Sequence, residues 1–161
     1  MEKQYRKPRL EAIDYDKNSF PRDVILETSA YCNLKCIMCP YPGLKRSKGE
    51  MDFEIFKKIV HEIVQENPFS RLWIAIMGEP FMRGNSLIKM LRYARNAGLE
   101  NIHVNTNATY LSEEMTDKLR DCDIKELLVS LDASTKETYN RIRLGGEFDT
   151  VIRNVEYFLK K

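Results

Sequence analysis

Two kinds of hydrophobic pattern alternate along the chain. Short runs of apolar and β-branched residues are typical of buried strands, while apolar residues three and four positions apart are typical of amphipathic helices. The short runs predict strands over 24–29, 72–77, 102–105 and 127–131. The longer periodicity predicts helices over 52–66, 85–97 and 112–121, one that opens near 134 and breaks at 145–146, and one from near 149 onward.

Residues that favour helix ends flank these stretches. Asp52 precedes the first helix and is a natural N-cap, because its carboxylate can accept hydrogen bonds from free backbone N–H groups. Gly98 follows the second helix, at a position where a left-handed residue commonly ends a helix. Ser134 and Glu137 have the spacing of a capping box, which predicts that Ser134 caps the fourth helix.

Strands and helices alternate in four units, and this order predicts an α/β fold with a parallel sheet and helical crossovers. In such folds the functional residues gather where the strands end, at the carboxyl edge of the sheet. A segment suited to chemistry follows each predicted strand: a cysteine-rich loop, 78–79, 105–107 and 130–132. The sequence therefore predicts a site assembled from the strand ends.

The polar residues near two strand ends occupy alternate positions along the chain. His103, Asn105 and Asn107 alternate with apolar residues, and so do Ser130 and Asp132. Since side chains two positions apart lie on the same face of a strand, each polar set is expected on one face. The apolar residues between them are expected to pack on helices. The polar sets are therefore predicted to face a concave interior that holds a ligand.

Three of the four cysteines, Cys32, Cys36 and Cys39, fall in one segment with the spacing C-x3-C-x2-C. Thiolates this close can each bind a different iron of a cubane cluster. A four-iron cluster normally takes four protein ligands, so three would leave one iron open to a small molecule. Zinc is the alternative, although it usually takes four ligands. The remaining cysteine, Cys122, lies far along the chain and is predicted to be a buried small hydrophobe.

This segment resembles the cluster loop of the radical SAM superfamily, and the resemblance extends over 24–161. It implies a partial (β/α) barrel, a [4Fe-4S] cluster held by Cys32, Cys36 and Cys39, and S-adenosylmethionine (SAM) bound at the open iron. In the family, an electron from the cluster cleaves the sulfonium bond, and the resulting 5′-deoxyadenosyl radical abstracts hydrogen from the substrate. The cofactors supply this chemistry, while the protein orients them.

The resemblance also implies a role for Gly78-Glu79-Pro80, which is similar to the family motif that contacts the amino group of SAM. Met77 stands where many members have a second glycine. Glycine permits a close approach of the backbone, and a carboxylate accepts hydrogen bonds from an ammonium group. Without the resemblance, the tripeptide is equally consistent with an ordinary turn.

Five further residues are candidates for contacts with SAM. Ser130 and Asp132 look like the family's ribose or carboxylate contact, although Asp132 also suits a helix-entry cap. Arg143 is similar to an arginine that pairs with the SAM carboxylate, the alternative being a solvated helix charge. Met38 occupies the family position beside adenine, the alternative being core. Asn107 is predicted either to contact the ligand or to make a turn.

Composition and charge argue against several other classes of protein. Lys and Arg number 26 and Asp and Glu 24, which gives no reason to expect a nucleic-acid or membrane surface. No apolar run approaches the roughly 20 residues of a membrane span, and the first ten residues lack the apolar core of a secretory signal. A reducing, cytoplasmic setting is expected, where clustered cysteines are typical of metal or redox sites.

Residues 1–21 are interpreted as an N-terminal extension, and 22–161 as the N-terminal part of a radical SAM core. Family cores usually contain more strand–helix units than the four predicted here, so the core is expected to be incomplete. The stretch over 130–149 is similar to members that carry a C-terminal cysteine-rich domain with extra clusters.

Three hypotheses remain open. The first is an enzyme core that acts on a peptide or a small molecule, with electrons from a reductant such as a ferredoxin or flavodoxin. The second is a cluster-binding fragment without turnover. The third is a zinc-stabilised structural domain.

Overall fold

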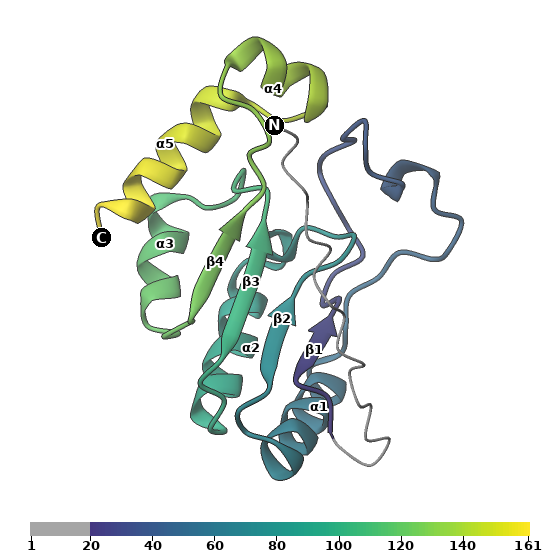
Figure 1. Cartoon of the computed structure of the whole chain (residues 1–161), viewed down its shortest axis with the longest axis vertical. Coiled ribbons are helices and arrows are strands. Elements are labelled where there is room, and N and C mark those ends of the chain that lie inside the picture. The colour runs from purple at the N-terminus through teal and green to yellow at the C-terminus, as the bar shows by residue number, and fades with distance from the viewer. Residues whose placement is uncertain (1–19) are drawn as a thin grey trace, which may run out of the picture.

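The computed structural model describes residues 20–161, whose strands form one parallel sheet. The order of the strands in the sheet follows the sequence (Figure 1): β1 (Asp23–Leu26), β2 (Arg71–Ile74), β3 (Ile102–Thr106) and β4 (Glu126–Val129). The predicted α/β class with four strand–helix units is confirmed. Of the interpreted N-terminal extension 1–21, residues 1–19 lie outside the described residues.

Helical segments connect the strands and follow the last one. They are the short 3-10 helices η1 (Tyr41–Gly43) and η2 (Pro80–Arg83), and the α-helices α1 (Phe53–Glu66), α2 (Asn85–Asn96), α3 (Glu113–Arg120), α4 (Lys136–Ile142) and α5 (Phe148–Leu159). Within 20–161, none of these helices has the length and apolar character needed to cross a bilayer.

All four strands run in the same direction, so their carboxyl ends meet at one edge of the sheet. The ladder pairs Leu26 with Ile74, Ile74 with Val104, and Thr106 with Val129. In Figure 1 the arrowheads point toward one end of the molecule, where the loop after β1 and helix α4 also lie. This edge is where the sequence predicts the functional residues.

Three predicted strands run past the observed ends, and the first two of them do so for identifiable reasons. The first leaves the ladder after Leu26, because the next residues pair with the far stem of the cysteine loop, as in the antiparallel bridge between Ser29 and Glu50. The second ends at Ile74, and Ile76 then adopts a φ of 100°. A β-branched residue strongly disfavours this left-handed region, so the turn is held by its surroundings.

The predicted helix ends are confirmed at two places and wrong at one. Asp52 caps α1 by accepting hydrogen bonds from the N–H groups of residues 54 and 55 at 2.7 and 3.3 Å. Gly98 follows α2 with a φ of 108°, which suits glycine. The capping box of Ser134 and Glu137 does not form, because α4 starts one residue later and the Thr135 hydroxyl accepts from the Thr138 N–H at 3.3 Å.

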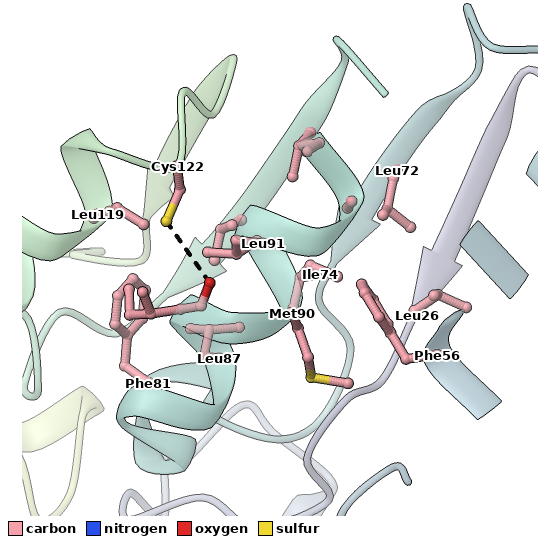
Figure 2. Close-up of a cluster of buried hydrophobic side chains, with 14 of the residues drawn as sticks. Leu26, Phe56, Leu72, Ile74, Phe81, Leu87, Met90, Leu91, Leu119 and Cys122 are labelled. Atoms are coloured by element: carbon pink, nitrogen blue, oxygen red, sulfur yellow. Dashed lines mark hydrogen bonds between the residues drawn. The ribbon is translucent and has the colours of Figure 1, made fainter. Parts of the chain in front are cut away.

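The helix-facing side of the sheet carries the hydrophobic core. Leu72 and Ile74 of β2 are fully buried, as are Ile102 and Val104 of β3. Burial of an aliphatic side chain of this size stabilises the fold by roughly 1.5–3 kcal/mol. Figure 2 shows the apolar side chains from α1, the β2–α2 connection and α2 that belong to the same cluster: Phe56, Phe81, Leu87, Met90 and Leu91.

Cys122 belongs to this core and stands apart from the other cysteines. It is completely buried, and its thiol points toward the carbonyl oxygen of Ile88 at 3.9 Å (Figure 2). Burial raises the pKa of this thiol above its ordinary value. The prediction that Cys122 is a buried small hydrophobe is confirmed.

The opposite face of the sheet was predicted to be polar, and it is polar only in part. His103 lies on it, with its ring stacked on Trp73 at a centroid distance of 4.3 Å and its Nδ1 atom 2.9 Å from Glu126 Oε2. However, Ile25 and Leu128 share this face and are 55% and 46% exposed. The face is therefore mixed, with apolar and polar side chains side by side.

Candidate functional site

One cavity of about 170 Å³ lies at the carboxyl edge of the sheet. The cysteine loop contributes to its wall, and so do the segments that follow β2, β3 and β4. The fold brings nine of the candidate residues together around this cavity, whose lining includes Cys32, Cys36, Cys39, Met38, Gly78, Glu79, Asn107, Ser130 and Arg143. The candidate Asp132 does not line it.

The cysteine loop is closed at its base by an antiparallel pair of backbone hydrogen bonds. The N–H of Ala30 donates to the carbonyl of Gly49 at 2.8 Å, and the N–H of Met51 donates to the carbonyl of Thr28 at 2.9 Å. The two stems of the loop therefore lie side by side. All three clustered cysteines fall between them along the chain.

Tyr41 of η1 organises the interior of this loop. Its side chain is only 6% exposed, and its hydroxyl accepts a hydrogen bond from the N–H of Cys32 at 2.9 Å. The N–H of Tyr41 in turn donates to the Sγ atom of Cys39 at 3.4 Å. One buried tyrosine thus links the first and third cysteines.

The segment after α4 supports the loop from the other side. The N–H of Lys35 donates to the carbonyl of Leu144 at 2.8 Å, and the N–H of Ile37 donates to the carbonyl of Ile142 at 3.0 Å. This strand-like pairing connects two parts of the chain that are far apart in sequence. It places Arg143, between the two carbonyls, beside the loop.

The guanidinium of Arg143 contacts both a cysteine and a carboxylate. Its Nη1 atom donates to Cys36 Sγ at 3.5 Å, and its Nη2 atom forms an ion pair with Asp132. Burial alone would lower the pKa of Arg143, but Cys36 and Asp132 together raise it, so the group stays charged. The side chain is 13% exposed, which rules out a solvated helix charge. Asp132 binds Arg143 and does not cap α4, a role that Thr135 fills.

Gly78 is required by a close backbone approach. A Cβ atom at this position would lie 1.7 Å from the carbonyl oxygen of Ser29 and 3.0 Å from that of Tyr31. Any side chain would therefore push the end of β2 away from the cysteine loop. Its φ lies outside the left-handed region, so the requirement is one of space.

Glu79 is a buried carboxylate that accepts three hydrogen bonds. Its Oε1 atom accepts from the hydroxyl of Thr106 at 2.8 Å and from the N–H of Phe81 at 3.1 Å, and its Oε2 atom accepts from the N–H of Asn107 at 2.7 Å. The N–H of Glu79 also donates to the carbonyl of Tyr31 at 2.7 Å. Burial raises the pKa of Glu79, and the three donated bonds oppose that rise.

Asn107 connects β3 to the cysteine loop. Its Nδ2 atom donates to Asn33 Oδ1 at 3.0 Å and lies 4.0 Å from Cys32 Sγ, while its Oδ1 atom accepts from the N–H of Thr109 at 3.0 Å. The turn foreseen for Asn107 therefore forms, and its contact with a ligand stays a prediction. The amino-acid sequence did not identify Asn33 as a site residue. The one feature that could have done so is its position as a polar residue between two clustered cysteines.

Ser130 and Met38 complete the candidate residues. The N–H of Ser130 donates to the carbonyl of Thr106 at 2.8 Å, which extends the sheet by one bond and leaves the hydroxyl at the cavity. Met38 is 55% exposed and lines the same cavity, which argues against the alternative of a core position.

The donor set at the cavity fits an iron–sulfur cluster. All three clustered cysteines are free thiols, and burial, reinforced by the negative charge of Glu79, raises the pKa of Cys32. Across residues 20–161, no three His, Cys, Asp or Glu side chains surround a position for a single metal ion. A cubane cluster assigns each cysteine to a different iron, so its ligands need no common centre.

The sequence profile of the radical SAM superfamily matches residues 26–161, which is most of the chain. The chain belongs to the radical SAM superfamily. Members of this family use a [4Fe-4S] cluster and SAM. The resemblance predicted from the cysteine loop and the strand ends is therefore confirmed.

Individual radical SAM proteins agree with this assignment. The AdoMet-dependent heme synthase of Methanosarcina barkeri (strain Fusaro / DSM 804) is 31% identical over 144 residues, which cover 87% of this chain and 40% of that protein. The structure of anSMEcpe with bound AdoMet and Cp18Cys peptide has a TM-score of 0.67 and 27% identity, and the match covers 86% of this chain and 40% of that one.

Streptococcus suis SuiB bound to S-adenosylmethionine shares the fold, with a TM-score of 0.74 and 19% identity over 88% of this chain and 32% of that one. Together with the open four-stranded sheet, this likeness confirms the partial barrel. The chain spans between 32% and 40% of the length of the proteins named here, so only part of the radical SAM architecture is compared.

The space around Gly78 leads to a first prediction. Gly78→Ala should lower the free energy of unfolding of the cluster-free protein by about 1–3 kcal/mol, because the new Cβ must displace the Ser29 carbonyl. Urea denaturation measures this change. Gly49→Ala is the matched control, since a Cβ there meets nothing within 4 Å. Equal midpoints for Gly78→Ala and the wild type would contradict the close approach.

Proposed function

We propose that Cys32, Cys36 and Cys39 hold a [4Fe-4S] cluster and that SAM binds beside it in the same cavity. The observation that carries this proposal is that three free thiols line one cavity together with Glu79 and Arg143. Three cysteine ligands leave one iron of a cubane cluster without a protein ligand. The negative charge of Glu79 and the positive charge of Arg143 are complementary to the ammonium and the carboxylate of the methionine part of SAM.

The cavity offers a complementary group for each part of SAM. Glu79 is suited to the ammonium group, because its Oε2 atom accepts a single hydrogen bond from residues 20–161. The guanidinium of Arg143 is suited to the carboxylate. The hydroxyl of Ser130 and the amide of Asn107 are suited to the ribose hydroxyls. The exposed side chain of Met38 provides apolar surface for adenine.

The cofactors supply the chemistry of this function, and the chain supplies their positions. When bound, the cluster and SAM would supply one-electron cleavage of a sulfonium bond and, through it, hydrogen-atom abstraction from a substrate. Asn107 and Arg143 fix the thiols of Cys32 and Cys36 from two sides. Glu79 is fixed by its own three hydrogen-bond donors, so its orientation exists before SAM arrives.

The substrate is proposed to be a peptide or a small molecule. One relative is a heme synthase, and one solved structure holds a peptide beside AdoMet, so both classes occur among similar proteins. A low-potential one-electron donor, such as a ferredoxin or flavodoxin, is the proposed reductant. We place these functions in a core domain over 22–161, with further segments of the whole protein completing the barrel.

A cluster-binding fragment without turnover remains the second candidate. It is favoured by the open edge of the sheet at β4, because the cavity lacks walls from any strands beyond β4 within 20–161. A zinc-stabilised domain has less support, since the described residues place no three possible ligands around one ion.

The cluster assignment predicts the iron content of two cysteine variants. After anaerobic reconstitution, the wild-type chain should contain about four irons and about four labile sulfides. Cys36→Ala should retain less than about half of that iron, because one iron loses its ligand. Cys122→Ala should match the wild type, since Cys122 lies in the core. Stoichiometric zinc without labile sulfide would contradict the assignment.

Glu79→Gln should weaken the affinity for SAM by about tenfold, because the amide replaces a charge-assisted hydrogen bond with a neutral one. Anaerobic isothermal titration of the reconstituted protein measures this affinity, and its iron content should stay at the wild-type level. Glu62→Gln, on the exposed face of α1, serves as the control. An unchanged SAM affinity in Glu79→Gln would show that this carboxylate does not bind the ammonium group.

The two leading candidates differ in one product. If the chain is a working core, the reconstituted protein should form 5′-deoxyadenosine from SAM under dithionite, and Cys36→Ala should form none. Chromatography of the quenched reaction measures this product. A wild-type protein that holds its cluster and binds SAM but forms no 5′-deoxyadenosine would favour the binding fragment.

A further inference from the structure

Arg83, the last residue of η2, carries a buried guanidinium that does not line the cavity. Its side chain is only 6% exposed. Arginine is almost never fully buried unless its charge and its hydrogen-bond donors are satisfied. A specific set of partners must therefore hold the guanidinium in this place.

Those partners are the two stems of the cysteine loop. Nη1 of Arg83 donates to the carbonyl of Thr28, before the loop, and Nη2 donates to the carbonyl of Met51, after it, at 3.0 Å. The N–H of Met51 donates to the same Thr28 carbonyl at 2.9 Å. One planar guanidinium therefore spans both stems, a geometry that its fixed fork of donors allows.

Among the described residues, few other contacts join the two stems of the loop. Besides the Met51–Thr28 bond, the stems share one backbone bond from the N–H of Ala30 to the carbonyl of Gly49. In addition, Arg46 inside the loop forms an ion pair with Glu27, just before it. Gly49 and Glu50 are both exposed to solvent, so water competes for these backbone groups. Opening of the base would change the distance between residues 32 and 39, which carry the first and third thiols.

We propose that Arg83 is a positioning residue that keeps the cysteine loop closed at its base and so fixes the spacing of the cluster thiolates. Arg83 follows Glu79 by four positions. One short segment therefore contributes a carboxylate to the cavity lining and a guanidinium to the base of the loop. The consequence for the cluster rests on the proposed function, whereas closure of the loop base does not.

The ion pair of Arg83 with Glu50 is a separate contact and contributes little. The Nη1 atom lies 3.6 Å from Glu50 Oε2, and the Glu50 side chain is 43% exposed. Ion pairs that reach solvent on one side are weak. Loss of the Glu50 charge should therefore leave the loop closed, and Glu50→Gln separates the carbonyl contacts from the ion pair.

Hydrogen exchange of the cluster-free protein tests closure of the loop. In Arg83→Met the amides within 28–51 should exchange roughly tenfold faster than in the wild type, while α1 and α2 keep their protection. Arg83→Lys should restore part of the protection, since one ammonium can still donate to a stem carbonyl. Glu50→Gln and Arg92→Met, an exposed arginine of α2, should behave as the wild type.

Release of iron to a ferrous chelator tests the consequence for the cluster. Reconstituted Arg83→Met should lose its iron roughly tenfold faster than the wild type, and Arg83→Lys should fall between them. If the amides within 28–51 of Arg83→Met exchanged at the same rate as in the wild type, the proposal would be overturned. An equal loss of protection in α1 and α2 would also overturn it, because it would indicate a general loss of stability.

The outcome for the proposed function is distinguishable. A wild-type chain that takes up no cluster would contradict the proposed function, while the exchange of 28–51 would still decide the role of Arg83. A cluster held as firmly in Arg83→Met as in the wild type would overturn the link between loop closure and cluster retention.

Discussion

The site depends on the buried carboxylate of Glu79. The carboxylate accepts three hydrogen bonds, and through them it joins the end of β2 to the end of β3. The backbone N–H of Glu79 donates to the carbonyl of Tyr31 in the cysteine loop. An unsatisfied carboxylate in this place would carry a large desolvation cost, so the donors from Thr106, Phe81 and Asn107 must be in position together. The relative placement of three strand ends thus follows from the hydrogen bonding of one residue, whose side chain joins β2 to β3 and whose backbone N–H joins β2 to the loop after β1.

The cysteine loop has little regular structure of its own and takes its shape from the rest of the fold. Asn107 holds it from β3, the carbonyls after α4 hold it through Lys35 and Ile37, and Arg83 holds its base. Each of these contacts comes from a different strand–helix unit. The arrangement of the three cysteines is therefore formed only once the parallel sheet is assembled, which couples the geometry of the thiols to the stability of the core.

Local patterns predicted the helices well and their ends less well. The periodicity of 52–66 and the carboxylate of Asp52 are properties of one segment, and both were confirmed. The choice between Ser134 and Thr135 as a cap depends on where α4 meets the rest of the fold, so sequence could not decide it. Likewise, the exposure of Met38 and the burial of Arg143 depend on segments far away along the chain.

The amino-acid sequence was enough to predict the family, the alternation of strands and helices, and nine of the residues that line the cavity, because these rest on local spacing and on the rule that parallel strands end at one edge. Which group contacts which became clear from the tertiary structure alone. Arg143 meets Cys36, Asn33 meets Asn107, and Arg83 spans the loop stems. These contacts join segments that are distant in sequence. The distance between such segments in space is set by the packing of the whole fold, and no local sequence pattern predicts it.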